Sequence, residues 1–397
     1  MSKKMSISFM FIILFCLIII ILGIVKAEPK IKLIDIKGSK VNIGNALFIS
    51  QKNNGFYCNT QSITSKDEFN FKQNSKSIQN KNNDINVKYQ KDEVFKHSYD
   101  EALRYYGKNN IGYIRDMGVN EETNRIIIFN KNLKDNSIKT YNLDIPKIND
   151  NEYISQLTVD INDDDVYILC NTSNYDSSIC NKLGVYIYKY NLNRGESKKV
   201  GEFISNKELK DLYRDCFNYN GKLYSFTQTY PLKKGVNIEL LLTYYDIKNN
   251  KLENIKLSHP MLKSKDFLNL NKYEDPKFSI EGNKVYFLNC INNDEKYIKL
   301  IKTTINLNNN KIEDIDTYDV EKLENISYVQ SFRVIDKKLY LCIKGYDVEN
   351  PSDYKPRVYK NSIVVVDEKS KETLYMGEYI EDLPELTDQF ILKTDEI

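Results

Sequence analysis

The sequence predicts an all-β fold of the β-propeller type, with five to seven four-stranded antiparallel blades. The first observation is a phrase that recurs after a short turn: a charged residue, an aliphatic residue and a tyrosine, followed by mostly apolar residues. The tyrosines of the phrase lie roughly 55–60 residues apart, a period typical of radially arranged β units. They are Tyr167, Tyr224, Tyr286 and Tyr340.

The second observation is that most of these hairpins are followed by another hairpin, so that each repeat holds four strands. The first hairpins pair residues 113–117 with 125–129, 153–159 with 166–170, 212–219 with 223–228, 278–280 with 285–290, and 331–335 with 339–343. The second hairpins pair 185–190 with 198–203, 240–247 with 252–257, 298–307 with 312–315, and 363–366 with 373–376. Four antiparallel strands repeated around an axis are the signature of a propeller.

The chain begins with a short basic tail and an apolar run over residues 9–25. A helix over this run would be about 25 Å long, close to the lower limit for crossing a bilayer. We therefore expect an N-terminal apolar helix within residues 1–30 that is either a cleaved signal peptide, favoured by the small residue Ala27, or a single transmembrane anchor. Residues 31–397 then form the propeller-like domain.

This N-terminal segment predicts a location at the cell membrane, or secretion. A short basic tail usually stays in the cytoplasm, which places the body of the protein outside the cell. The lysines that follow Val25 favour the opposite orientation.

The segment before the regular hairpins is less uniform. Asn54-Gly55 lies between two short apolar runs and predicts a hairpin, because both residues of such a tight turn need positive φ. Residues 61–95 are rich in Lys, Asn, Gln and Ser, and we expect a polar insertion with too little apolar surface to pack. Residues 92–106 predict a short helix with its apolar side chains loosely on one face.

Five repeat units are clear, and the N-terminal strands predict a sixth. Residues 390–393 are apolar enough to close this unit. Pairing of the two chain ends would remove the open sheet edges that invite aggregation. An irregular pair of β-sandwiches is the structural alternative.

The repeated phrases resemble the blades of bacterial β-propeller-like repeat proteins. The resemblance rests on the tyrosine phrases and on a second phrase, complete at Tyr245-Asp246-Ile247, and it covers roughly residues 111–379. It implies the architecture and no particular functional family.

Strand geometry makes a further prediction, because successive side chains point to opposite faces of a sheet. In each repeat, the aliphatic residue of the phrase should lie on one face and the tyrosine on the other. The aliphatic residues are Val166, Leu223, Val285 and Leu339.

Six cysteines follow the apolar segment, and an even number in an exported chain permits disulfides. We expect at most one, Cys170–Cys180, at the base of a loop. Cys290 and Cys342 lie inside apolar strand runs and should be buried and reduced.

Charge and motifs exclude several kinds of function. The chain has 57 basic and 55 acidic residues, so its electrostatics give no reason to expect a nucleic-acid partner. The acidic run 160–165 invites a calcium site, but a calcium loop needs Gly where Asp165 stands and Glu where Asn171 stands. We expect it to be a hairpin turn.

The only histidines, His97 and His259, have no supporting motif for nucleophilic catalysis. The sequence therefore predicts no catalytic, cofactor-binding or metal-binding residue. The tyrosine pairs at 105–106 and 244–245 could form a sugar- or peptide-binding face, although packing within the fold explains them as well.

These absences favour a membrane-anchored or secreted, non-catalytic binding or scaffolding module, with an envelope protein or a glycan as partner. The main alternative is an extracellular polysaccharide hydrolase or lyase, because carboxylates are plentiful and the sequence does not show which of them lie close together. A third reading is a sensor domain joined to the anchor.

Overall fold

The computed structural model describes residues 32–53, 58–73, 92–95, 103–119, 123–146, 152–174, 184–204, 210–230, 239–263, 277–291, 296–322, 326–347, 358–380 and 388–393. Nearly all of these residues lie in antiparallel strands. The helical turns of this part of the chain are the short 3-10 segments η1 (Lys40–Ile43), η4 (Glu93–Phe95) and η5 (Pro260–Lys263). The predicted all-β class is confirmed.

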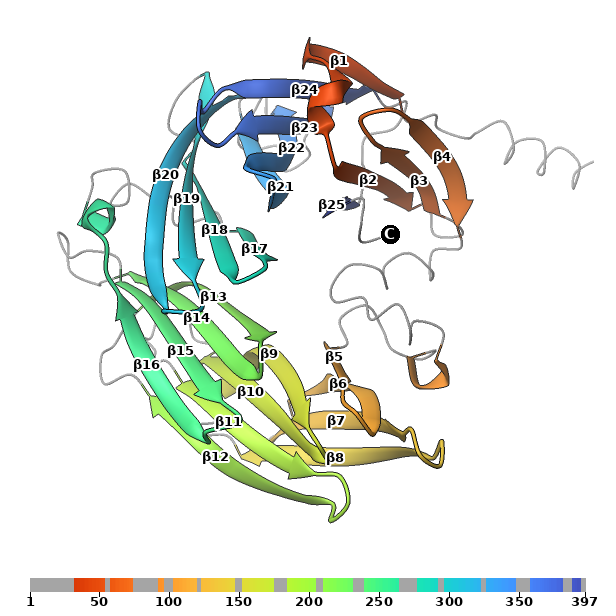
Figure 1. The fold of residues 1–397 in the computed structure, drawn as a ribbon, viewed down its shortest axis with the longest axis vertical. Coiled ribbons are helices and arrows are strands. Elements are labelled where there is room, and N and C mark those ends of the chain that lie inside the picture. Colours follow the sequence, from red (N-terminus) through yellow and green to blue (C-terminus); the bar gives the residue numbers. More distant parts are fainter. Residues whose placement is uncertain are drawn as a thin grey trace, which may run out of the picture.

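The described strands form six antiparallel sheets, which we call sheets I to VI (Figure 1). Sheet I contains β25 (Asp388–Lys393), β2 (Ala46–Asn53), β3 (Cys58–Ile63) and β4 (Glu68–Gln73). Sheet II contains β5 (Leu103–Tyr106), β6 (Asn110–Val119), β7 (Thr123–Asn132) and β8 (Ile138–Pro146). Sheet III contains β9 (Glu152–Asn162), β10 (Asp165–Asn174), β11 (Gly184–Asn191) and β12 (Glu196–Ile204).

The other three sheets follow the same pattern. Sheet IV contains β13 (Lys210–Tyr219), β14 (Lys222–Tyr230), β15 (Glu239–Asp246) and β16 (Lys251–Leu257). Sheet V contains β17 (Lys277–Glu281), β18 (Lys284–Ile291), β19 (Tyr297–Asn306) and β20 (Lys311–Glu321). Sheet VI contains β21 (Ile326–Ile335), β22 (Lys338–Asp347), β23 (Val358–Asp367), β24 (Thr373–Ile380) and, as a fifth strand, β1 (Lys32–Gly38).

The sheets stand around a common centre, as in a propeller. The first strands of neighbouring sheets contact one another: β9 contacts β5 and β13, and β21 contacts β17 and β25. Figure 1 shows the fourth strands β8, β12, β16 and β20 on the outside of the ring. The predicted propeller-like architecture is confirmed, with six blades in the described part of the chain.

The two ends of the described chain are paired to different sheets. β25 joins β2 in register from Ala46↔Lys393 to Gln51↔Asp388 and supplies the innermost strand of sheet I. The predicted closure by residues 390–393 is therefore confirmed. β1 pairs with β24 at the outer edge of sheet VI, from Lys32↔Ile380 to Gly38↔Tyr375.

The repeated phrase packs each sheet against the next. Tyr167 of sheet III lies in one apolar cluster with Leu223 of sheet IV, and Tyr224 of sheet IV in another with Val285 of sheet V. Tyr286 and Leu339 repeat this arrangement between sheets V and VI. The prediction that tyrosine and aliphatic residue lie on opposite faces is confirmed. The tyrosine faces the following sheet, and the aliphatic residue faces the preceding one.

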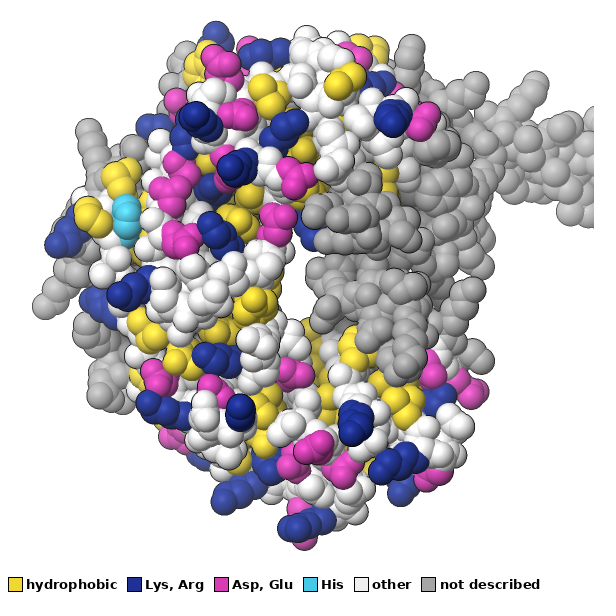
Figure 2. Space-filling view, viewed as in Figure 1, with side chains coloured by type: hydrophobic (Ala, Val, Ile, Leu, Met, Phe, Trp, Pro, Cys, Tyr) yellow, Lys and Arg dark blue, Asp and Glu magenta, His cyan; other side chains and the backbone are white. Residues whose placement is uncertain are grey.

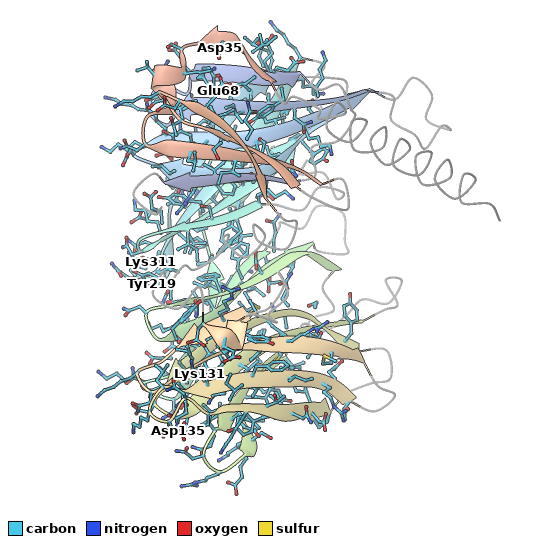
Figure 3. All side chains as sticks on the ribbon, turned by 90° about the vertical axis from the view of Figure 1, so that its right-hand side faces the viewer. Asp35, Glu68, Lys131, Asp135, Tyr219 and Lys311 are labelled. Atoms are coloured by element: carbon cyan, nitrogen blue, oxygen red, sulfur yellow. The ribbon has the colours of Figure 1, made fainter. Side chains whose placement is uncertain are left out.

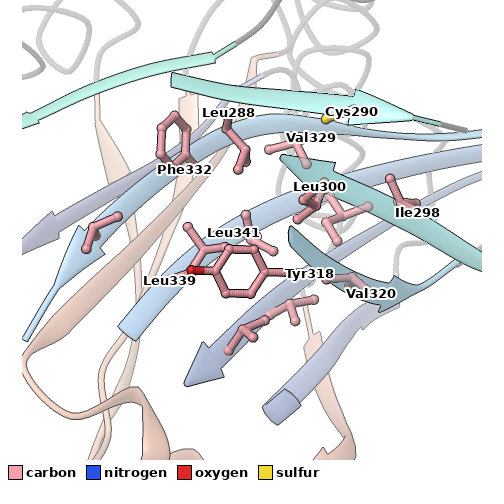
Figure 4. Packing of buried hydrophobic residues seen from close by; sticks show 14 of the residues in the cluster. Leu288, Cys290, Ile298, Leu300, Tyr318, Val320, Val329, Phe332, Leu339 and Leu341 are labelled. Atoms are coloured by element: carbon pink, nitrogen blue, oxygen red, sulfur yellow. The ribbon is translucent and has the colours of Figure 1, made fainter. Parts of the chain in front are cut away.

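The cluster between sheets V and VI shows how these interfaces are filled. Side chains from both sheets interdigitate, with Tyr318 of β20 beside Leu339 and Leu341 of β22 (Figure 4). All three are almost fully buried. Burial of apolar area of this kind is the dominant favourable term in folding, at about 25 cal/mol per Å².

The hairpin turns place short polar residues where the backbone needs positive φ. Asn220, Asn250 and Asn310 have φ near +50° at the β13–β14, β15–β16 and β19–β20 turns. Asn tolerates this conformation better than other non-glycine residues, because its side chain bonds to the local backbone. Asp163, at φ 53°, does the same between β9 and β10, so the prediction that the acidic run is a turn is confirmed.

These turns lie on one side of the ring, which we call the turn face. The labelled residues of Figure 3 lie along this side, and three of them mark hairpin turns: Tyr219 at β13–β14, Lys311 at β19–β20 and Asp135 at β7–β8.

The sequence placed the strands of sheet II wrongly. The segment predicted as a helix, 92–106, contains η4 and the strand β5, and residues 96–102 lie outside the described part. The hairpin of residues 113–117 and 125–129, predicted to supply the first two strands of this unit, corresponds to its second and third strands, β6 and β7. Pairing of Tyr105 with Gly112 and full burial of the tyrosine ring outweigh a loose helical pattern.

The predicted polar insertion also begins in ordered strands. In sheet I, β3 pairs with β2 on one side and with β4 on the other. A strand needs one buried face rather than two, and Ile63 supplies it with a fully buried side chain. Residues 74–91 of the segment lie outside the described residues.

The N-terminal segment predicted to meet the membrane lies outside the described residues too. Of the helices in the part that the structure describes, none is long and apolar enough to span a bilayer.

Cysteine burial follows the expectation in part. Cys290 and Cys342 are buried free thiols, as predicted, and burial raises the pKa of Cys342 to about 12. Cys170 is also a buried free thiol, so the predicted Cys170–Cys180 bridge is not formed. The reason is the direction of the side chain, because Cys170 packs into the apolar cluster between sheets II and III. Cys180 lies outside the described residues.

Gly112 provides a test of the packing in sheet II. A Cβ added there would lie 2.0 Å from the Phe129 carbonyl oxygen and 2.5 Å from the Tyr105 hydroxyl oxygen. We expect Gly112→Ala to lower the free energy of unfolding by about 3 kcal/mol, because the backbone has to move. Gly282→Ala is the control, since its Cβ meets no atom within 4 Å and only the φ of +56° is strained, which costs about 1 kcal/mol. Equal losses in denaturant unfolding would contradict the packing.

Candidate functional site

Ionisable side chains from two sheets meet at the turn face, between sheets V and VI. We call this group the Lys302 cluster. β19 contributes Lys302, β20 contributes Asp314, Asp316 and Tyr318, and the β23–β24 turn contributes Glu368 and Lys371.

Lys302 lies at the centre of the cluster. It shares the face of β19 that carries Ile298 and Leu300, so its side chain points between the sheets and is only 4% exposed. Its Nζ contacts Glu368 Oε1 and lies 3.3 Å from Asp316 Oδ2. A buried ammonium is tolerated only when it is paired, and these two carboxylates from different sheets pair it.

Aromatic rings complete the surroundings of this ammonium. Lys302 Nζ lies 5.7 Å from the ring centre of Tyr286 and 5.8 Å from that of Tyr318. Lys371 Nζ lies 4.5 Å from the Tyr318 ring centre. Cations are attracted to the faces of such rings at these distances. Both lysines therefore lie against tyrosine rings of sheet V.

Asp316 is held by two lysines, a tyrosine and the neighbouring Asp314. Lys302 and Lys371 each contact one of its oxygens, and the Tyr318 hydroxyl lies 3.4 Å from Oδ2. Burial alone would raise the pKa of this carboxyl. The hydrogen bonds from Asp314 and Lys371 and the two lysine charges outweigh burial and lower its pKa to about 2. Asp316 is thus ionised at neutral pH.

Asp314 has the opposite tendency. Its hydrogen bond to Asp316 raises its pKa, and burial and the negative charge of Asp316 add to the effect. Two carboxyl groups in contact disfavour each other's ionisation, and the more exposed Asp314 is the one whose pKa is raised. A pair of carboxyls whose pKa values are driven apart is the usual arrangement of an acid and a base in an active site.

Glu368 approaches from the facing sheet. Its backbone N–H donates to the Lys337 carbonyl at 3.1 Å. The rest of the turn is fixed by Asp367 Oδ1, which accepts the N–H groups of Lys369 at 3.0 Å and Ser370 at 2.7 Å. These bonds hold the Glu368 carboxylate against Lys302.

The separations of the carboxyl groups bear on the chemistry. Asp316 and Glu368 contact the same ammonium, which places their bonded oxygens within roughly 6 Å of each other. Asp314 is one further contact away, so its carboxyl lies within roughly 10 Å of Glu368. Glycoside hydrolases place their two carboxyls about 5–5.5 Å or about 6.5–9.5 Å apart. These upper limits leave room for either separation.

The cluster is partly open to solvent. Asp316 and Glu368 are each 20% exposed and Lys371 is 36% exposed. Figure 2 shows acidic and basic side chains side by side over the part of the ring where β20 and β24 lie, and an opening at the centre of the ring. The carboxyl groups can thus be reached from the turn face.

The acidic run that suggested calcium is engaged in hydrogen bonds between strands. Asp164 accepts the side-chain amides of Asn110 and Asn193, each at 2.8 Å, and Asp165 accepts that of Asn191 at 2.7 Å. Within the described residues, no three acidic, histidine or cysteine side chains are grouped so that they could hold a metal ion.

The other candidates from the sequence do not come together. His259 Nδ1 accepts the N–H of Met261 at 3.2 Å in η5, far along the chain from any carboxyl of the cluster, and His97 lies outside the described residues. Tyr105, Tyr244 and Tyr245 are buried, which confirms the packing explanation and leaves no exposed tyrosine-pair platform there.

Comparison with known proteins supports the architecture of the fold and identifies no family. No family model matches the chain, and no curated protein matches it by sequence. Among solved structures it is similar to a cobalt-substituted apocarotenoid oxygenase of Synechocystis, at 8% identity and a TM-score of 0.46, over 93% of this chain and 97% of that one.

Two further matches are to propeller-type proteins. One is the GH32 β-fructofuranosidase BmSUC1 of Bombyx mori, at 12% identity and a TM-score of 0.32, over 68% of this chain and 63% of that one. The other is TolB from Acinetobacter baumannii, at 7% identity and a TM-score of 0.32, over 88% and 66%. These likenesses concern the architecture alone, and no substrate follows from them.

The main functional prediction from the sequence, a non-catalytic binding or scaffolding module, finds no support among them, since the similar structures include an oxygenase and a glycoside hydrolase. The sequence favoured this module because it lacks histidine and glycine motifs of catalysis. Its carboxyl groups left a hydrolase or lyase open as the alternative, because their grouping depends on which strands lie side by side.

The Lys302 cluster left a faint signal in the sequence. Asp314, Asp316 and Tyr318 alternate along one strand and so share a face, and Lys302 follows Ile298 and Leu300 on one face of its strand. A lysine on such an apolar face requires a buried partner. The partner Glu368 comes from a different sheet, 66 residues along the chain, and no local pattern indicates it.

The lowered pKa of Asp316 makes the stability depend on pH. Its ionised form is favoured by the fold, so this contribution is present above the unfolded pKa of about 3.9 and is lost as pH falls through about 2. We expect Asp316→Asn to lower the free energy of unfolding at pH 7 by about 1–2 kcal/mol, since the carboxylate is partly solvated. The difference from wild type should shrink as pH falls from 4 to 2 in denaturant unfolding.

Asp319→Asn is the matched control on the same strand, because Asp319 is exposed. Its effect should stay within about 0.5 kcal/mol at every pH. If Asp316→Asn lowered the free energy of unfolding by the same amount at every pH, the charge of the carboxylate would not be what stabilises the fold.

Proposed function

We propose that this protein is a hydrolase that cleaves glycosidic bonds of polysaccharides at the Lys302 cluster. The observation that carries the proposal is the meeting of three carboxyl groups from two sheets around one buried lysine, with the pKa of one driven up and that of another driven down. Such perturbed groups occur preferentially at functional sites. This develops the alternative that the sequence left open.

Asp314 is the proton donor in this proposal. It is exposed, its pKa is raised, and its hydrogen bond to Asp316 is the main cause of that rise. While it holds its proton, such a carboxyl can protonate the oxygen that leaves when the glycosidic bond breaks. The electron pair of the broken C–O bond stays on this oxygen.

Glu368 acts from the opposite side. It belongs to the facing sheet and contacts Lys302, whereas Asp314 lies on the sheet that carries Lys302. In a single displacement it takes a proton from a water molecule, whose oxygen then bonds to the anomeric carbon. One proton is given by Asp314 and one is accepted by Glu368, so the step balances.

The remaining members of the cluster position these two groups. Asp316 hydrogen-bonds to Asp314 and orients its carboxyl group, and Lys302 joins Asp316 to Glu368 across the sheets. Lys371, the most exposed of the lysines, lies over the Tyr318 ring at the entrance.

We also propose a location for the protein, which rests on the N-terminal sequence alone. Residues 31–397 lie outside the cell, either held at the membrane by residues 9–25 or released after cleavage of this segment. Polysaccharide is abundant in that compartment, which agrees with the proposed substrate.

Substitution of the two acting carboxyls tests the reaction. Asp314→Asn and Glu368→Gln should each lower polysaccharide turnover by about 10²–10⁴-fold, because general acid and base catalysis is worth that much. Turnover of the full-length protein would be measured as new reducing ends from a panel of neutral and acidic polysaccharides. Wild-type activity should fall as pH rises through the raised pKa of Asp314, since the acid then loses its proton.

Asp319→Asn serves as the control here as well and should keep full turnover. Thermal unfolding of each variant separates loss of reaction from loss of fold. No turnover by the wild-type protein on any polysaccharide, or full turnover by folded Glu368→Gln, would refute the proposal.

The location has its own test. Protease added to intact cells should degrade residues 31–397, because the body is proposed to lie outside. Intact-mass analysis distinguishes the two forms of the N-terminus, since cleavage after Ala27 leaves Glu28 as the first residue. A body that is protected until the cells are broken would place it in the cytoplasm.

A further inference from the structure

β1 is attached to sheet VI more weakly than its length suggests. It pairs with β24 along its whole length, but the register is interrupted between Asp35 and Lys37. Leu33 is its buried apolar anchor, whereas Ile36 is 55% exposed. A strand at a sheet edge with little buried apolar surface opens at low free-energy cost.

The contacts of β1 and η1 end on the residues next to the β23–β24 turn. Asp35 Oδ1 accepts the Tyr375 hydroxyl at 2.7 Å, and the Asn42 side-chain amide donates to the Leu374 carbonyl at 2.9 Å. Gly38 packs so closely that a Cβ there would lie 2.0 Å from the Leu374 carbonyl oxygen. Leu374 is three residues from Lys371 of the Lys302 cluster.

The ring remains closed without β1. The pairing of β25 with β2 closes sheet I near the centre, whereas β1 pairs at the outer edge of sheet VI. Release of β1 would therefore expose one edge of β24 and leave the six-sheet ring intact. β1 is also the first described strand after the segment that we propose meets the membrane.

We propose that β1 is a detachable strap that holds the β23–β24 turn, and that its release from β24 moves Glu368 and Lys371 away from Lys302. The Lys302 cluster would then respond to the position of the N-terminal segment. The consequence for catalysis rests on the proposed hydrolase function, whereas the movement of the turn does not.

Gly38→Val tests the strap in the full-length protein, because a valine cannot fit against the Leu374 carbonyl. Hydrogen exchange would be measured at the amides of Lys369, Ser370 and Lys371, which donate within the turn. We expect their exchange to become at least tenfold faster. Gly195→Val is the matched control: it has a similar φ of +68°, lies in the β11–β12 turn, and should leave this exchange unchanged.

A covalent lock provides the reverse test. Ile34 and Glu378 are paired residues of β1 and β24, so cysteines at both positions can be joined by oxidation. Oxidation of Ile34→Cys/Glu378→Cys should slow exchange at the turn relative to the reduced form. An unchanged rate would overturn the strap.

Other outcomes are equally decisive. Unchanged exchange at the turn in Gly38→Val, with fast exchange in β1, would show that the turn does not depend on the strap. Equally fast exchange in β2, where it pairs with β25, would show that β1 is needed to close the ring and would overturn the proposal too. If the turn loosens but polysaccharide turnover does not change, the strap stands and its coupling to the reaction is refuted. If the wild-type protein shows no turnover, exchange still decides the strap.

Discussion

The structure depends on the closing of its sheet edges around a centre. A ring of sheets is stable only if the last sheet meets the first, because an open inner edge would present unpaired N–H and C=O groups. β25 provides this closure: it returns from the far end of the chain to become the innermost strand of the sheet built from β2, β3 and β4. The inter-sheet contacts, including those at the Lys302 cluster, presuppose this closed ring.

Within the ring, one alternation does most of the packing. In sheets III to VI the second strand places an aliphatic residue toward the preceding sheet and a tyrosine toward the next. Tyrosine suits this position because its ring buries a large area, while its hydroxyl can still find a partner. Tyr340 illustrates this, since its buried hydroxyl donates to the Ile43 carbonyl of η1 at 2.9 Å.

The sequence was sufficient for the fold where the pattern is local. The alternation of Val166 with Tyr167 and the positive-φ turn at Asn220 are properties of neighbouring residues, and both were predictable. The strand β5 was not, because what makes it a strand is the pairing of Tyr105 with Gly112. The hairpin predicted at Asn54-Gly55 agrees with the pairing of β2 and β3, but β4 and most of β3 were missed because their polar residues are held by backbone pairing.

The candidate site was much harder to predict than the fold. Asp314 and Asp316 lie two residues apart, so their proximity is a local property of a strand. Their link to Glu368 passes through Lys302 and exists only because sheets V and VI stand side by side. The residues around a charged side chain in the sequence do not indicate its partner on another sheet. This is why the sequence favoured a non-catalytic protein.

The return of β25 also has a consequence for how the chain is made. Sheet I lacks its innermost strand until residue 393 has been synthesised, although β2 to β4 are among the first strands to leave the ribosome. During that interval β2 presents an unpaired edge, which other chains can bind. A chain that lacks β25 would keep this edge permanently. The strand that ends the risk of aggregation is thus the last of the described strands to be translated.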